Sequence, residues 1–104
     1  MDRSRYLAYR SATRSLERIA EWRLDHHERE RLRDTAEALL LTTDADEAER
    51  LRRDAAVALS LLVGQRRCDD AQADALWSEI SACGPRDPLG ATRRPRALTF
   101  AGAL

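Results

Sequence analysis

Residues 44–64, DADEAERLRRDAAVALSLLVG, decide the fold class of this chain. Asp44 stands three residues before Glu47, the spacing at which two side chains satisfy free backbone amides at the start of an α-helix. Gly64 is the residue type that most readily accepts the left-handed conformation at a helix end. Apolar residues between these signals fall on one helical stripe: Ala48, Leu51, Ala55, Ala58, Leu59 and Leu62. The stretch therefore predicts an amphipathic helix over residues 45–63.

The same signals recur on both sides of this helix. Asp25 and Asp69 each precede a Glu or Gln by three residues, and Gly84-Pro85 cannot continue a helix. We therefore expect helices at about 4–24, 26–42, 45–63 and 70–83. The last should bury one apolar stripe, formed by Ala73, Leu76, Trp77 and Ile80.

The composition favours an all-α fold. Among 104 residues there are 18 Ala and 15 Leu, but only two Val, two Ile and 5% aromatic residues. Ala, Leu, Arg and Glu are strong helix formers, whereas strands need β-branched and aromatic residues. A chain of this length has room for one core, so residues 1–83 should form one small bundle of about four helices.

Residues 84–104 form a tail that contains Pro, Gly and Arg. It holds all three Pro and three of the four Gly of the chain, so no long helix is expected there. The tail is either flexible or docked, on the bundle or on a partner, through its apolar residues Leu98, Phe100 and Leu104.

The boundary between the first two helices allows two interpretations, because neither Gly nor Pro lies near Asp25. On a helical projection Tyr9 and Leu16 lie on one side, whereas Leu32 and Leu39 lie on the opposite side. One straight helix over residues 4–42 would present these faces to two different partners. We expect a break near Asp25 instead.

Charge is balanced in total but not along the chain. All 18 basic residues are Arg, with no Lys, against 18 acids, which is typical of a GC-rich bacterial genome. Residues 1–24 carry six Arg and three acids, residues 25–83 eight Arg and fourteen acids, and residues 84–104 four Arg and one acid. Zero net charge argues against a protein that coats nucleic acid by bulk electrostatics.

Several classes of protein are excluded. No apolar run reaches the ~18 residues of a membrane span, and the charged residues 1–10 lack the apolar centre of a secretory signal. Two cysteines are too few for a disulfide scaffold, so we expect a cytoplasmic chain with free thiols. The sequence shows no nucleophile elbow and no glycine-rich phosphate loop, and its carboxylates alternate with Arg, so we expect no enzyme and no cofactor.

The two His and two Cys residues are the candidate metal ligands. Adjacent residues on a helix point about 100° apart, so His26 and His27 cannot easily share one ion. Cys68 and Cys83 match no paired-cysteine spacing. We prefer a polar helix start for the histidines. Cys68 follows two Arg and precedes a helix start, which would favour a thiolate, but Asp69 and Asp70 oppose it.

Nucleic-acid binding is the alternative function. Arg forks match phosphate geometry, and the first helix interleaves them with Tyr6, Tyr9 and Trp22. The acidic helix after Cys68 fits no DNA groove, so phosphate or acidic-partner contacts would come from the two ends of the chain: Arg3, Arg5, Arg10, Arg14, Arg93, Arg94 and Arg96.

We expect a protein-interaction or self-assembly module that uses an apolar Leu/Ala face with basic ends. Leucines are clustered in residues 39–41 and 59–62, and a small bundle cannot bury every side of such runs. Leu41 and Leu61 should remain exposed. The predicted interaction face is Leu40, Leu41, Leu61, Leu62 and Trp22, and its partner is a second copy or another protein.

Overall fold

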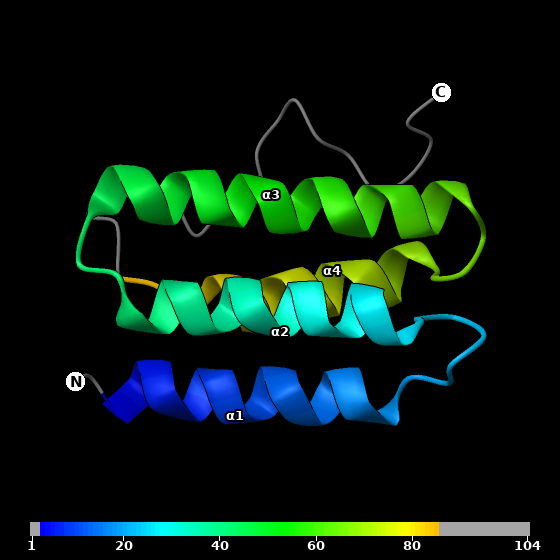
Figure 1. Ribbon diagram of the computed structural model, residues 1–104, viewed down its shortest axis with the longest axis horizontal. Helices are drawn as coiled ribbons and strands as arrows, with labels where there is room; N and C mark the ends of the chain where they lie inside the picture. The colour runs from blue at the N-terminus through cyan, green and yellow to red at the C-terminus, as the bar shows by residue number, and fades with distance from the viewer. Residues whose placement is uncertain (1–2, 86–104) are drawn as a thin grey trace.

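A computed structural model describes residues 3–85, which form four helices and no strand. Consecutive helices run in opposite directions, joined by short connections at the two ends of the molecule (Figure 1). The helices are α1 (Arg3–Arg18), α2 (His26–Leu41), α3 (Ala45–Gly64) and α4 (Asp70–Ser81). The predicted all-α bundle of four helices is confirmed.

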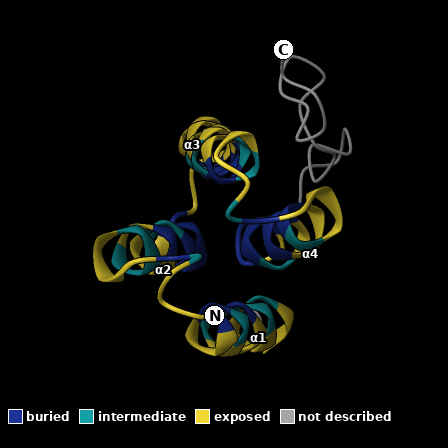
Figure 2. Ribbon diagram, turned by 90° about the vertical axis from the view of Figure 1, so that its right-hand side faces the viewer, coloured by how far each residue is buried: buried dark blue, intermediate teal, exposed yellow. Residues whose placement is uncertain are grey.

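The helices surround one core. Both α1 and α3 pack against α2 and α4, and α2 also meets α4 across the centre. Consequently α1 and α3 lie on opposite sides of the bundle, and each helix turns its buried side inwards (Figure 2). Alanines at the contacts, among them Ala12, Ala36, Ala55 and Ala73, are at most 1% exposed and let the helices approach closely.

The chain breaks between the first two helices, as expected, but earlier than predicted. α1 ends at Arg18 rather than at residue 24. The amides of Arg23 and Leu24 donate to the Ala20 carbonyl at 2.9 and 3.1 Å, so the chain turns there. Leu24 is buried in the core. In a continued helix, Ile19 and Leu24 would point to different sides. The break lets both pack in one core.

Aspartates begin the other three helices, as predicted. The Asp25 carboxylate accepts from the Glu28 amide at 2.8 Å, and Glu28 accepts from the Asp25 amide at 3.0 Å. The hydrogen bond from the Glu28 amide holds the pKa of Asp25 below its ordinary value. Asp69 caps α4 through the Gln72 amide at 2.7 Å. Asp44 bonds the Asp46 amide instead of that of Glu47.

The end of α3 differs from the prediction. Gly64 is the last helical residue, and the left-handed position belongs to Arg66, with φ 59°. The Arg66 amide donates to the Val63 carbonyl at 3.0 Å and the Arg67 amide to the Leu62 carbonyl at 2.9 Å. This is the Schellman arrangement, in which glycine is the usual left-handed residue. The turn that completes these two bonds follows Gly64, so the left-handed position falls two residues after the glycine.

The stripes predicted for α3 and α4 face the core. Leu59, Leu62, Leu76 and Ile80 are buried, together with the Trp77 ring. α4 ends at Ser81 rather than residue 83, and a turn follows in which the Gly84 amide donates to the Ser81 carbonyl at 3.3 Å.

Two arginines inside the bundle bind carbonyl groups at the ends of neighbouring helices. Arg52 of α3 is 3% exposed and donates to the Ser81 carbonyl at 3.0 and 3.1 Å and to the Pro85 carbonyl at 2.8 Å. Its own carbonyl accepts from the Trp77 indole at 3.2 Å. Arg29 of α2 donates to carbonyls in and after the last turn of α1: those of Leu16, Ile19 (3.1 Å) and Leu24 (2.9 Å). Both satisfy acceptors that a helix end leaves free.

Arg5 does the same, which corrects its predicted role as a contact for phosphate or an acidic partner. Its guanidinium, half-buried, donates to the Cys83 carbonyl at 2.9 Å after α4. At the end of α2 it donates to the carbonyls of Leu39 (2.7 Å), Leu40 (3.0 Å) and Thr42 (2.9 Å). With four hydrogen bonds directed into the bundle, Arg5 is a structural residue. We call Arg5, Arg29 and Arg52 the inner arginines.

Candidate interaction surfaces

A groove of about 460 Å³ runs between α2 and α3 on the outside of the bundle. Val57 and Leu61, one turn apart on α3, border it and are 43% and 61% exposed. Polar side chains lie around these two residues, and the main ones are Arg31, Asp34 and Asp54. A smaller hollow of about 100 Å³ continues the groove beside Leu61. The region thus combines exposed aliphatic residues with charges of both signs.

Of the predicted interaction face, Leu41 and Leu61 are exposed, at 63% and 61%. Leu40 and Leu62, by contrast, are only 8% and 3% exposed and belong to the core. Neighbours on a helix point about 100° apart, so only one leucine of each adjacent pair can face solvent. Leu40 and Leu62 are therefore corrected to core residues.

Leu41 lies beyond the groove, at the end of α2. It lies seven residues after Asp34, which is nearly two full turns, so both side chains leave the helix on the same side. We define the α2–α3 face as Leu41, Val57 and Leu61. Val57 was missed from the sequence, although its position four residues before Leu61 is a signal for a shared helix side.

Trp22 lies apart from this face, in the connection between α1 and α2. Its ring is 68% exposed, and the Arg23 guanidinium stacks on it at 4.6 Å from the centroid. Arg23 also donates to the Gln72 side chain at 3.3 Å. Trp22 is thus exposed as a single aromatic residue, and it does not line the groove.

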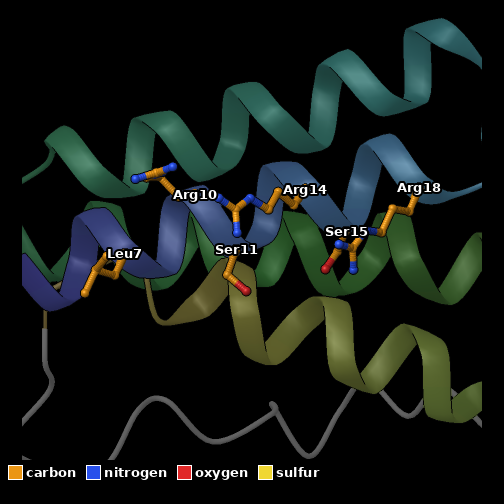
Figure 3. A pocket seen from close by; sticks show the side chains of 6 residues that line it. All are labelled: Leu7, Arg10, Ser11, Arg14, Ser15 and Arg18. Carbon is orange, nitrogen blue, oxygen red and sulfur yellow. The ribbon is translucent and has the colours of Figure 1, made fainter.

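Arginines also gather on the outer side of α1. A hollow of about 260 Å³ is lined by Arg10, Arg14 and Arg18 together with Leu7, Ser11 and Ser15. Figure 3 shows these six side chains along α1. The side chains of Arg14 and Arg18 fold back along α1 towards Ser11 and Ser15 (Figure 3). The guanidinium groups of these arginines and of Arg3 form no hydrogen bond or ion pair with another residue of the range 3–85.

A carboxylate closes the α4 side of this hollow. Glu79 accepts hydrogen bonds from the hydroxyl of Ser15, at 2.8 and 3.0 Å, and from that of Ser11. These bonds join the middle of α1 to α4. Because both hydroxyls donate to Glu79, they are not available as donors to a bound phosphate, and the carboxylate would repel one.

The remaining predicted contacts, Arg93, Arg94 and Arg96, lie outside the described residues, as does the predicted docking of the tail.

The candidate metal ligands are not gathered. His26 and His27 are exposed neighbours with ring centroids 6.0 Å apart. Among residues 3–85, no three side chains of the types His, Cys, Asp and Glu come together as a metal site would require. Cys68 and Cys83 are both free and buried, on different connections of the chain.

Neither thiol lies in an environment that favours the thiolate. Burial raises the pKa of Cys68, and the charge of Asp69 raises it further, outweighing Arg23 and Arg67. Burial raises the pKa of Cys83 to about 12. Thiolates are the reactive form of cysteine, so both residues behave as small core side chains.

The described helices include none with the length and apolar character needed to cross a bilayer. Comparison with protein-family models, with curated proteins and with solved structures finds no match to this chain.

Proposed function

We propose that this chain is a protein-interaction module that binds a second copy of itself through the α2–α3 face. The observation that carries the proposal is the exposure of Val57 and Leu61 beside the groove, with the exposed Leu41 further along α2. Burying aliphatic side chains against each other contributes about 25 cal/mol per Å² of apolar area removed from water. Exposed aliphatic residues bordered by charges are typical of a surface that another protein covers.

The distribution of charge and apolar residues suits a two-fold symmetric pair. Leu61 lies at the end of the groove where α2 begins, and Leu41 lies where α2 ends. A two-fold axis across the middle of the groove brings the Leu41 end of one copy to the Leu61 end of the other. Arg31 lies towards the Leu61 end, so the same rotation places it near Asp34 and Asp54 of the second copy.

Sedimentation velocity on the full chain tests this proposal. We expect a dimer at tens of micromolar, and a monomer of unchanged helix content for Leu61→Asp, because a carboxylate in the interface loses its water. The matched control is Leu7→Asp, which places the same charge on an equally exposed leucine of α1. It should leave the dimer intact. A wild-type monomer at 1 mM, or equal dissociation of both variants, contradicts self-association through this face.

A further inference from the structure

Four arginines and one leucine form a straight ridge on the outer side of α1: Arg3, Leu7, Arg10, Arg14 and Arg18. Steps of three and four residues keep them on one side of the helix. At 1.5 Å per residue the ridge is about 22 Å long. We call this set the arginine ridge.

The arginine ridge contains most of the arginines whose guanidinium groups bind no other described residue. Seven of the fourteen arginines in residues 3–85 bind another described side chain or carbonyl group. Of the other seven, four lie on the ridge, and Arg31, Arg50 and Arg66 lie singly on other elements. Unpaired positive charge is therefore concentrated on one side of α1.

Carboxylates lie on both flanks of α1. Towards α4, Glu79 accepts from Ser11 and Ser15, and α4 contains Asp70 and Asp74 but no basic residue. Towards α2, the charges of Glu37 and Asp34 reach Tyr9, and Arg33, which also lies there, is paired with Glu30. The positive stripe is consequently only one helix wide.

We propose that the arginine ridge binds an acidic α-helix of a partner protein. Carboxylates spaced i, i+4 on a helix are about 6 Å apart along its axis, which is the spacing of Arg10, Arg14 and Arg18. Arg forks and carboxylates match in geometry, and Leu7, 51% exposed within the ridge, offers apolar contact.

The width of the stripe distinguishes an acidic helix from nucleic acid. Phosphates of a duplex line both sides of grooves about 6–12 Å wide, so a duplex on α1 would lay phosphates over Glu37 and Glu79. A single helix that carries its acids on one side meets the arginines without covering these carboxylates. The inference is independent of the proposed self-association, because α1 lies opposite α3 (Figure 2).

Fluorescence anisotropy with labelled synthetic peptides tests the inference on the full chain. The probe is an Ala-rich helical peptide with Glu at positions 3, 7, 10, 14 and 18, and its control has the same composition with Glu spread around the helix. We expect the striped peptide to bind about fivefold more tightly than the control, since exposed ion pairs each add little. Equal affinities of the two peptides overturn the proposal.

Two variants of equal charge locate the site. Arg10→Gln with Arg14→Gln should weaken binding of the striped peptide about fivefold. Arg50→Gln with Arg66→Gln removes two unpaired arginines elsewhere and should change it less than about twofold. Equal losses in both variants would show attraction to net charge only and contradict the ridge as the site.

A nucleic-acid arm completes the test. A single-stranded oligonucleotide and a duplex, labelled in the same way and measured at 150 mM salt, should bind more weakly than the striped peptide. If either binds more tightly and loses affinity in the Arg10 and Arg14 variant, the ridge is a phosphate-binding surface and the inference of an acidic helix is wrong.

Discussion

The inner arginines and the arginine ridge use the same side chain in opposite ways. Arg5, Arg29 and Arg52 point into the bundle and bind carbonyl groups at the ends of three helices. The four ridge arginines are exposed, and their guanidinium groups form no hydrogen bond or ion pair with a described residue. What separates the two sets is whether a free helix end lies within reach of the guanidinium.

The helix ends explain why the inner set exists. Neither α2 nor α4 has a basic residue in its last turn, and the chain contains no Lys and no Asn. Free carbonyl groups at those ends must nevertheless be satisfied when they are buried. An arginine from a neighbouring helix supplies several donors at once, so it caps a helix and ties two helices together.

Replacing an inner arginine should have the largest effect. Arg52→Met leaves the buried Ser81 carbonyl and the partly buried Pro85 carbonyl without these donors, so we expect a loss of about 2–4 kcal/mol in the free energy of unfolding. Urea denaturation followed by circular dichroism measures it. Arg52→Lys should recover only part of the loss, because one ammonium group cannot span both carbonyls.

The matched control for Arg52 is its neighbour Arg53. Arg53 is exposed and forms only a surface pair with Glu49 at 3.1 Å, so Arg53→Met should cost about 0.5 kcal/mol or less. If Arg52→Met and Arg53→Met lower the free energy of unfolding by similar amounts, burial inside the bundle does not determine how much an arginine contributes to stability.

A smaller loss in the free energy of unfolding is expected when a side chain at position 84 crowds the Arg52 guanidinium. A Cβ at Gly84 would lie 2.8 Å from the Arg52 side chain and 2.8 Å from Leu39, so Gly84→Ala should destabilise the fold by about 1–3 kcal/mol.

At Gly64 no atom lies within 4 Å of an added Cβ. Gly64→Ala should therefore stabilise α3, by up to about 1 kcal/mol. Thermal unfolding of both variants should give shifts of opposite sign.

Arg66 is a third case, because its backbone rather than its side chain is constrained. Its φ of 59° is unfavourable for every residue with a Cβ except Asn and Asp. Arg66→Gly should raise the free energy of unfolding by about 0.5–1 kcal/mol, after the greater freedom of glycine in the unfolded chain is counted. Arg66→Ala, compared in the same urea titration, should give no such gain.

The ridge arginines should contribute least to stability. Arg10→Gln with Arg14→Gln removes no side-chain hydrogen bond or ion pair within residues 3–85. The free energy of unfolding from urea titration should therefore stay within about 0.5 kcal/mol of wild type. A loss as large as that of Arg52→Met would mean that the ridge has structural partners, and the distinction between the two sets would fail.

The sequence predicts the helices well where the signal is local. Asp25, Asp44 and Asp69 each begin a helix, because an N-cap depends only on residues two or three positions away. Helix ends are predicted less well. α1 stops at Arg18 because Leu24 packs in the core, and Arg66 replaces Gly64 as the left-handed residue through bonds that form only after the chain has turned.

The candidate surfaces are predictable only in part. Exposure of Leu41 and Leu61 follows from the clustering of leucines, but the choice between Leu40 and Leu41 needs the phase of the helix. Arg5 and Arg10 are alike in the sequence. Arg5 is structural only because the fold brings residues 39–42 and 83, up to 78 positions away in the sequence, next to its side chain.

The contacts of Arg5 also set an order in time. During synthesis at about 5–20 residues per second, α1 leaves the ribosome first. The carbonyl of Cys83 lies 78 residues further along, so its amide unit is added about 4–16 s after Arg5. Until then Arg5 has no partner at the end of α4. The first helix of the chain is therefore among the last to be fixed in place, and growing chains that stop before Cys83 should remain sensitive to proteolysis near their N-terminus.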